Sequence, residues 1–476
     1  MSLTRKLAWN TGVQLAGKIL STAFGIIIVG LMTRYLGQDG FGIYSTANAF
    51  LQIFALLLDL GLNVTLVALL GEHAGDKAYE KRCVSALFTF RLISSVLILL
   101  IVAPIITWLS PYPLETKLVI FALDASFFFP ALAQVLTGVQ QRHLKMHMAA
   151  FGDLLGRCVL LAGILFSKSL GWGLVPIVGF VSLGSLANFI LNFFATRKYA
   201  AIHWNWDPAF WRIALNRSWA VGLSIAFGLI YFKADTLILS LVRSEAEVGI
   251  YGAAYRVLEI LITVPFMYAG LILPILAKHG ADQRHKAFAD LVSTSIDVMV
   301  MLAAPLIIGT VLLGTRIMSL VAGDAFAASG DILKILVLAV GVIYLNTIFS
   351  HAVVAVDAQR RMIPTYIGVA IVTLIAYLLF IPTYGLYAAA WLTVLSETAV
   401  GVGSLVVTHR FSPLKFHIKT LLTTCLSGGV MGILIWTLQG LPVIPLVLIG
   451  IVTYGACLFL FGAISRATVK EMLAIK

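Results

Sequence analysis

Long apolar stretches that recur along the whole chain are the feature that most limits how this sequence can fold. A helix that crosses a lipid bilayer needs about 20 mainly apolar residues. Stretches of that length lie near residues 8–33, 41–70, 83–109, 118–139, 148–167, 172–195, 218–242, 248–276, 288–314, 330–356, 363–381, 385–407, 420–439 and 443–463. They predict an all-α integral membrane protein with about 14 transmembrane helices, although hydropathy alone also allows about 12.

The charge content agrees with a membrane protein and argues against a nucleic-acid partner. Only 11% of the residues are charged, compared with roughly 25% in soluble domains. The net charge of +12 would favour nucleic acid only if the basic residues formed one clustered face, and here they are spread over short loops. The four cysteines lie in or at the ends of apolar stretches, which indicates buried thiols. We therefore expect the lipid bilayer as a partner, and no nucleic acid.

The distribution of Lys and Arg predicts the orientation, because cytoplasmic loops carry an excess of both. With the N-terminus in the cytoplasm, most basic loop residues lie on the cytoplasmic side. The opposite side holds Arg34, Lys117, Lys168, Arg243 and Arg316. Both termini are therefore predicted to be cytoplasmic. The first apolar stretch exceeds the core of a signal peptide, about 7–15 residues, so we expect a retained helix in a multi-pass protein of the cell (inner or cytoplasmic) membrane.

Two copies of one short pattern, 207 residues apart, indicate an internal repeat. Phe41-Gly-Ile-Tyr44 opens the second apolar stretch, and Val248-Gly-Ile-Tyr251 opens the eighth. Because each copy contains an even number of helices, both copies enter the membrane in the same direction. The sequence thus predicts two parallel-related six-helix lobes and two C-terminal helices. At the two echoes we expect glycines that allow a tight entry into the helix, and tyrosines at the depth of the membrane interface.

This organisation divides the chain into four parts. They are an N-lobe, residues 1–195; a cytoplasmic interfacial connector, 196–217; a C-lobe, 218–408; and additional helices, 409–476. The connector contains Trp204, Trp206, Phe210 and Trp211 among basic residues. This composition favours a segment that lies on the membrane surface.

Polar residues follow one face of the second apolar stretch. Asn48, Gln52, Asp59 and Asn63 fall within roughly 60° of arc on a helix with 3.6 residues per turn. In the second copy, Glu259 stands at the repeat position of Gln52. Single polar residues in membrane helices usually form interhelical hydrogen bonds, but matching stripes in both copies favour a water-accessible cavity.

Basic residues inside the apolar stretches would suit an anionic headgroup in such a cavity, because guanidinium binds phosphate oxygens in a bidentate manner. Arg157 is near the middle of its stretch and is the best single candidate. Alternatives remain open for others: Arg256 can pair with Glu259, Arg91 can extend toward the interface, and Arg34 can bind loop carbonyls on the outer side. The predicted substrate-binding residues are Arg157, Arg91, Lys18, Lys233, Arg256, Arg34, Gln52 and Asn48.

Acidic residues at bilayer depth are candidate sites for a coupling proton or sodium ion, because an ionisable side chain there costs about 2.5–3.5 kcal/mol on insertion scales. The candidates are Asp59, Asp124, Asp235, Glu259, Asp297 and Glu397. We favour Asp235 and Asp59, which continue polar stripes, together with Glu259. The chain has no phosphate loop and no HExxH motif. We therefore expect a non-enzymatic protein without a metal or cofactor other than such an ion.

Several motifs resemble polysaccharide and O-antigen flippases of the multidrug/oligosaccharidyl-lipid/polysaccharide exporter superfamily. They are Arg34-Tyr-Leu-Gly37 followed by Phe41-Gly-Ile-Tyr44, Leu136-Thr-Gly-Val-Gln-Gln-Arg142, Lys233-Ala-Asp235 with Val248-Gly-Ile-Tyr251, and Ile381-Pro-Thr-Tyr-Gly-Leu-Tyr-Ala-Ala-Ala390 ahead of Glu397. Each motif is loose alone, and their order and spacing across the first twelve helices carry the resemblance.

The resemblance implies alternating access and transport of an undecaprenyl-pyrophosphate-linked oligosaccharide from the cytoplasmic to the outer leaflet. It also implies that cavity cations hold the pyrophosphate, that a cation gradient drives the cycle, and that polysaccharide polymerase or assembly proteins are partners. The alternatives are a cation-coupled multidrug exporter, a lipid II flippase, a membrane glycosyltransferase or ligase, and a scaffold for polysaccharide assembly.

Overall fold

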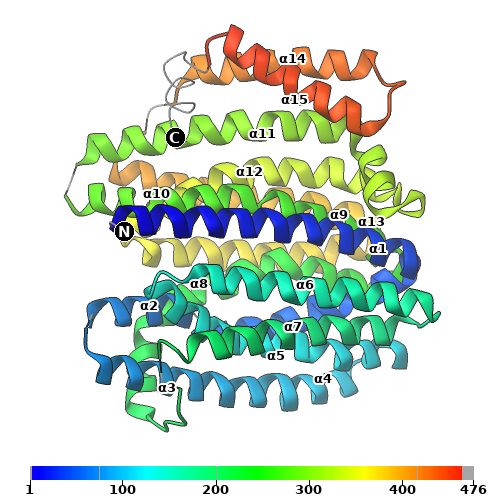
Figure 1. Cartoon of the computed structure of the whole chain (residues 1–476). Helices are drawn as coiled ribbons and strands as arrows, with labels where there is room; N and C mark the ends of the chain where they lie inside the picture. Colours follow the sequence, from blue (N-terminus) through cyan, green and yellow to red (C-terminus); the bar gives the residue numbers. More distant parts are fainter. Residues whose placement is uncertain are drawn as a thin grey trace. The chain divides into compact units, whose positions relative to one another are not determined.

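The computed structural model describes residues 3–59, 61–73, 75–200, 202–282, 284–414 and 416–463. Throughout these ranges the regular structure is helical, as predicted, and no strand is present (Figure 1). The helices of the first half are α1 (Leu3–Asp59), α2 (Leu62–Glu72), α3 (Lys77–Ser95), the π-helix η1 (Val96–Val102), α4 (Ala103–Leu109), α5 (Leu114–Arg142), α6 (Met146–Ser169), α7 (Leu174–Thr196) and α8 (Pro208–Val242). They are followed by α9 (Glu245–Leu261), α10 (Thr263–Ala281), α11 (His285–Ala322), the 3-10 helix η2 (Asp324–Phe326), α12 (Ser329–Ala355), α13 (Gln359–Phe411), α14 (Ile418–Thr437) and α15 (Val443–Leu460).

Eleven helical segments of the described chain are long and apolar enough to cross a membrane. Two of them, within α1 and α13, each cover two predicted spans. Each contains one glycine outside helical geometry, Gly37 with φ 68° and Gly385 with φ 59°. This left-handed region is accessible to glycine at little steric cost, so the chain turns there and begins a second helix. The prediction of a multi-span helical membrane protein is confirmed.

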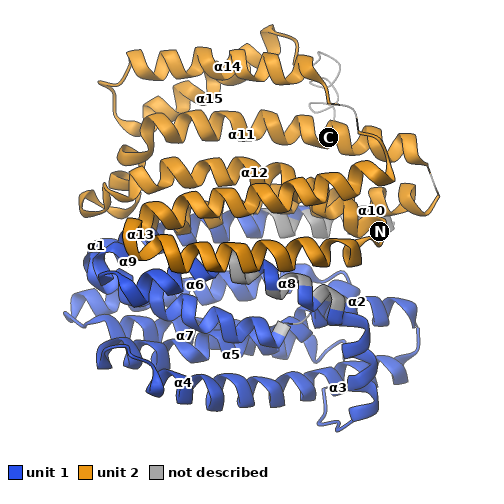
Figure 2. Cartoon of the chain, turned by 180° about the vertical axis from the view of Figure 1, so that it is seen from behind, with its two compact units in different colours: residues 1–252 blue, residues 253–476 orange. Residues whose placement is uncertain are grey.

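The chain forms two compact units, residues 1–252 and residues 253–476 (Figure 2). In the first unit α7 packs against both α5 and α6, and α1 packs against α5, α6 and α8. In the second unit α12 is the central helix, packed against α10, α11 and α13, while α14 and α15 pack against each other and against α11. The boundary lies inside α9, shortly after the second Gly-Ile-Tyr echo. The predicted lobe limits and the orientation of the termini stay predictions.

Two predicted spans are broken where the sequence suggested one continuous helix. The span at 41–70 ends its first segment at Asp59 and resumes at Leu62, after Gly61 with φ 71°. The expectation that Asn63 continues the polar stripe of Asn48 and Gln52 on one face was therefore wrong, because the break resets the helical phase. The span at 248–276 is interrupted at Ile262, three residues before Pro265.

A polar side chain from another helix compensates the backbone at each break. The guanidinium of Arg91, on α3, donates to the carbonyl oxygen of Leu58. In the second unit Pro265 has no N–H for the carbonyl of Leu261, four residues earlier. The hydroxyl of Tyr344, on α12, donates to that oxygen at 3.1 Å. Because hydrocarbon offers no water to an unpaired carbonyl, both contacts stabilise their kinks.

Replacing Tyr344 with Phe is expected to lower the free energy of unfolding by about 1–2 kcal/mol, because it removes only the donor to the carbonyl of Leu261. Unfolding of the purified protein in detergent measures the change. Tyr384→Phe is the matched control, since Tyr384 is 63% exposed. Equal stability of the two variants would show that the kink does not depend on this hydrogen bond.

The two Gly-Ile-Tyr echoes meet in space inside the first unit. A Cβ on Gly42 would lie 1.9 Å from the carbonyl oxygen of Glu245, and a Cβ on Gly249 would lie 2.1 Å from that of Gln38. Each of these Cβ atoms would also lie 3.1 Å from the other glycine's nitrogen. The glycines thus permit close backbone contact between two helices, and the expected tight helix entry was the wrong role. Tyr251 is fully buried rather than at the interface, because it binds a carboxylate described below.

Gly42→Ala and Gly249→Ala should each destabilise the protein by at least about 3 kcal/mol, because the added methyl group meets backbone atoms that cannot rotate away. Gly179→Ala, in α7, provides the control, since nothing lies within 4 Å of its Cβ position. That control is expected to be neutral or to gain about 0.5–1 kcal/mol from helix propensity. Yield of folded protein and thermal unfolding report the difference. Wild-type stability of both echo variants would contradict the close contact.

The connector between α7 and α8 is attached to α3 by its second half. The indole nitrogen of Trp211 donates to the carbonyl of Ala86 at 2.8 Å, and Arg82 binds Asp207 at 2.7 Å. The hydrogen bond from Arg82 holds the pKa of the Asp207 carboxyl below its usual range. Trp204 and Trp206 remain 66% and 62% exposed. Their exposure suits the predicted surface-lying segment, whereas Trp211 packs onto the first unit.

Candidate functional site

An accessible guanidinium lies where α6 packs against α1. Arg157 points its Nε toward Asp153 Oδ2 at 3.5 Å, and its side chain is 32% exposed. The hydroxyl of Ser21 donates to the same carboxylate oxygen. A Cβ on Gly25 would come within 2.8 Å of Arg157 Nη1. Arg157 is therefore loosely paired and partly solvent-accessible, which leaves hydrogen-bonding capacity for an anionic ligand.

The local sequence explains this arrangement. Gly17, Ser21 and Gly25 are spaced by four residues, so they share one face of α1. Their small side chains let α6 approach closely, as the 2.7 Å separation between a Cβ on Gly17 and Ala150 Cβ shows. Lys18 neighbours this face and is exposed. Sequence reasoning missed Asp153, although its position four residues before Arg157 was a readable signal.

The other first-unit candidates near α1 form contacts within their own helix. Gln52 Nε2 donates to Asn48 Oδ1 at 2.5 Å, so the two predicted polar residues are hydrogen-bonded neighbours. Arg34 directs Nη1 to the carbonyl of Gly30 at 3.5 Å, near the end of the helical segment that stops at Gly37. The side chain of Asp59 lies outside the described residues. The binding and coupling roles of these residues stay predictions.

Asp235 is the centre of a buried hydrogen-bonded group in the first unit. Its Oδ1 accepts from the backbone N–H of Thr236 at 2.5 Å and from the Thr236 hydroxyl at 3.1 Å. Its Oδ2 accepts from the hydroxyl of Tyr251 at 2.5 Å. Lys233, 8% exposed, lies against the ring of Phe232 at 5.4 Å. The structure thus joins two motifs that are separate in the sequence, Lys233-Ala-Asp235 and the second Gly-Ile-Tyr echo.

A double-mutant cycle tests this connection. Tyr251→Phe and Asp235→Asn should each cost about 2 kcal/mol, because each removes one partner of a buried charge-assisted hydrogen bond. The double variant should be more stable than the sum of the single losses predicts, with a coupling of about 1–2 kcal/mol. Unfolding in detergent measures all four proteins. Additive losses would show that the two side chains do not act as a pair.

The remaining predicted cations are already engaged. Arg256 Nη1 lies 2.8 Å from Glu259 Oε2, with the two side chains 25% and 24% exposed, so the intrahelical pairing considered from the sequence is present. Arg91 is 1% exposed and binds Gln134 Oε1 at 3.0 Å in addition to the Leu58 carbonyl. Neither arrangement tests a substrate role, but both give these side chains a structural one.

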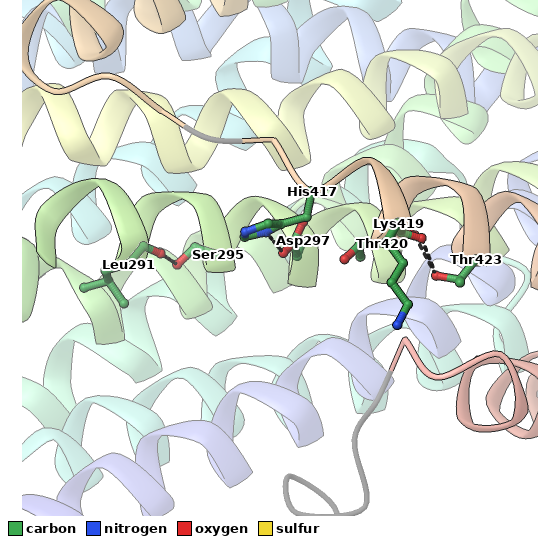
Figure 3. A network of polar contacts seen from close by, with 7 residues as sticks. All are labelled: Leu291, Ser295, Asp297, His417, Lys419, Thr420 and Thr423. Atoms are coloured by element: carbon green, nitrogen blue, oxygen red, sulfur yellow. Dashed lines mark hydrogen bonds and ion pairs between the residues drawn. The ribbon is translucent and has the colours of Figure 1, made fainter. Parts of the chain in front are cut away.

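Three further carboxylates differ in their surroundings. Asp297, on α11, has Oδ2 2.6 Å from Nδ1 of His417, which precedes α14 (Figure 3). This pair connects the additional helices to the second unit. Asp124, 6% exposed on α5, has an Oδ1 without a hydrogen-bond partner in the described part of the chain. Glu397, 5% exposed on α13, is hydrogen-bonded to Asn346. Within the described ranges no group of three His, Cys, Asp or Glu side chains could hold a metal ion.

Comparison with known proteins defines the class first. The fold matches lipid II flippase MurJ in an inward closed conformation, with a TM-score of 0.75, 16% identity and coverage of 94% of this chain and 98% of that one. It also matches an inward-facing multidrug resistance MATE family transporter of the MOP superfamily, with a TM-score of 0.68, 16% identity and coverage of 84% and 98%. The chain therefore has the fold of MOP-superfamily membrane transporters.

The family follows from the sequence match. Residues 4–279 match the model of the family described as "Polysaccharide biosynthesis protein", and the chain belongs to that family. A probable flippase, AglR of Haloferax volcanii, is 23% identical over 487 residues, which cover 98% of this chain and 99% of the relative. These relatives are named as flippases or transporters rather than enzymes, so the expected superfamily and the non-enzymatic class are confirmed.

Proposed function

We propose that this protein is a flippase for a polyprenyl-pyrophosphate-linked oligosaccharide, with undecaprenyl as the expected lipid, in the cell membrane. The family match and the relative named as a probable flippase support the class. The observation that carries the ligand chemistry is the partly exposed guanidinium of Arg157, midway along a membrane helix. A guanidinium at that depth is expensive unless it faces water or an anion.

The chemistry of transport is binding and release without covalent change. Pyrophosphate oxygens would accept from the Arg157 guanidinium, and Lys18 would contribute charge from the adjacent helix face. The sugars would follow the polar side chains, while the polyprenyl tail stays in the apolar phase. Alternating access between the two membrane sides and coupling to a cation gradient belong to this proposal. Polymerase or assembly proteins would take the flipped product.

Arg157→Gln should reduce flipping about 10–100-fold, because it removes a charged hydrogen bond of about 1.5–3 kcal/mol to the headgroup. The measurement uses proteoliposomes loaded with a labelled short polyprenyl-pyrophosphate oligosaccharide, with the labelled sugar scored by its accessibility to an added lectin. Asp153→Asn keeps the guanidinium and removes its competing carboxylate, so this variant should retain or strengthen headgroup binding.

Arg361→Gln, an exposed arginine at the start of α13, controls for the loss of one positive charge. Full activity of a well-folded Arg157→Gln variant would exclude the assigned site. Two specific outcomes would favour the rival functions in this superfamily. Preference for a substrate carrying a peptide stem would indicate a lipid II flippase, and export of cationic dyes without lipid-linked sugar transport would indicate a multidrug exporter.

A further inference from the structure

Glu397 is the one charged residue that is buried among the described residues of the second unit. It lies on the second segment of α13 and is 5% exposed. No Lys, Arg or His forms an ion pair with it in the described ranges. The other carboxylates near the membrane interior of this unit have basic partners: Glu259 has Arg256, and Asp297 has His417. Glu397 therefore differs from them in lacking a cation.

The turn at Gly385 brings Glu397 to its surroundings. The two segments of α13 lie close to each other, since a Cβ on Gly403 would be 2.5 Å from Thr365 Cγ2, and Tyr377 and Thr393 hydroxyls are 3.4 Å apart. α12 packs against α13, and Gly401 leaves room for Asn346, whose Cβ would be 3.7 Å from an added methyl. Glu397 is thus enclosed by α12 and the other half of its own helix.

One polar chain reaches Glu397 from the half-buried region. The Tyr366 hydroxyl is hydrogen-bonded to Ser350, and Ser350 Oγ donates to Asn346 Oδ1 at 3.1 Å. Because the Asn346 oxygen is occupied as an acceptor, its NH₂ group is the part that can donate to Glu397. The chain therefore orients an amide donor toward the carboxyl group.

These surroundings support both protonation states of one carboxyl group. A charged carboxylate without a cation is disfavoured in an apolar interior, which favours the neutral acid. The Asn346 donor offers a hydrogen bond to the carboxylate, which makes the charged state accessible. Neighbouring titratable groups are Tyr366 on α13 and His351 on α12, and His351 Nδ1 is held at 2.8 Å from the Thr347 carbonyl. The Arg256–Glu259 pair balances itself.

We propose that Glu397 is the proton-binding residue of the second unit, loaded and released once per transport cycle. On loading, an O–H bond forms on the carboxylate and its charge disappears. On release, the proton goes to water and Asn346 holds the resulting carboxylate. The proposal rests on the proposed function, because a proton site drives transport only in a coupled carrier.

A proton suits this site better than a metal cation. Hard cations in proteins require several oxygen ligands, and the neighbouring hydroxyls are engaged elsewhere. Thr393 Oγ1 donates to the carbonyl of Ala389, and Ser396 Oγ donates to that of Thr393. Glu397 and one amide are too few oxygens for a dehydrated sodium ion.

Infrared difference spectroscopy of the protein in lipid tests proton binding without any transport. The wild type should show, on a pH change, the C=O stretch of a buried protonated carboxylic acid. Glu397→Gln should abolish that band, and Asp290→Asn, which changes an exposed acid on α11 to an amide, should leave it intact. Asn346→Leu should keep the band but move its frequency, which assigns it to Glu397 even if Glu397→Gln fails to fold. A band unaffected by both Glu397→Gln and Asn346→Leu would overturn the proposal.

Flipping in proteoliposomes with and without a proton gradient tests the consequence. The gradient should accelerate the wild type about 10-fold, and Glu397→Gln should lose this acceleration while it keeps the gradient-free rate. Retained acceleration in Glu397→Gln, or drive by sodium alone, would overturn the proton site. If the wild type flips no lipid-linked sugar, the proposed function fails, and the infrared band still decides whether Glu397 binds a proton.

Discussion

The interior of a bilayer offers no water to hydrogen-bond a polar group, and the architecture of this protein depends on that constraint. Regular helices satisfy their own backbone. Where α1 stops at Asp59 and α9 stops at Leu261, helical hydrogen bonds are lost. Arg91 and Tyr344 supply donors to the carbonyls at these two places. The two solutions use different residue types from different helices, so the shared requirement is chemical and not a conserved side chain.

The same constraint explains the pair of Gly-Ile-Tyr echoes. Two helices cross with their backbones in contact at Gly42 and Gly249, where any side chain would separate them. Two residues beyond the second glycine, Tyr251 places its hydroxyl on Asp235. A short repeated pattern thus provides close approach in both copies, and in the second copy it also stabilises a buried carboxylate. The echo that reveals the repeat also has a direct structural role.

The charged residues at bilayer depth fall into three groups with different consequences for function. Arg157 is partly exposed and loosely paired, which suits reversible binding of an anion. Arg256 and Arg91 are engaged by Glu259 and by a backbone carbonyl, so their substitution will affect stability whatever else it does. Glu397 is buried with an amide partner. A charge becomes informative about transport only after the charges required for folding have been separated from it.

The sequence by itself determined the fold class, the positions of the apolar spans and the membership suggested by ordered motifs, because these depend on the length and hydropathy of contiguous residues. It also identified Arg157 and the partnership of Arg256 with Glu259, which are local along a helix. Tertiary structure alone decided that Gly61 interrupts the second span, that Tyr251 reaches Asp235, and that Asn346 faces Glu397. Those outcomes depend on a backbone angle at one residue or on contacts between distant segments, and periodicity along a single helix carries no information about either.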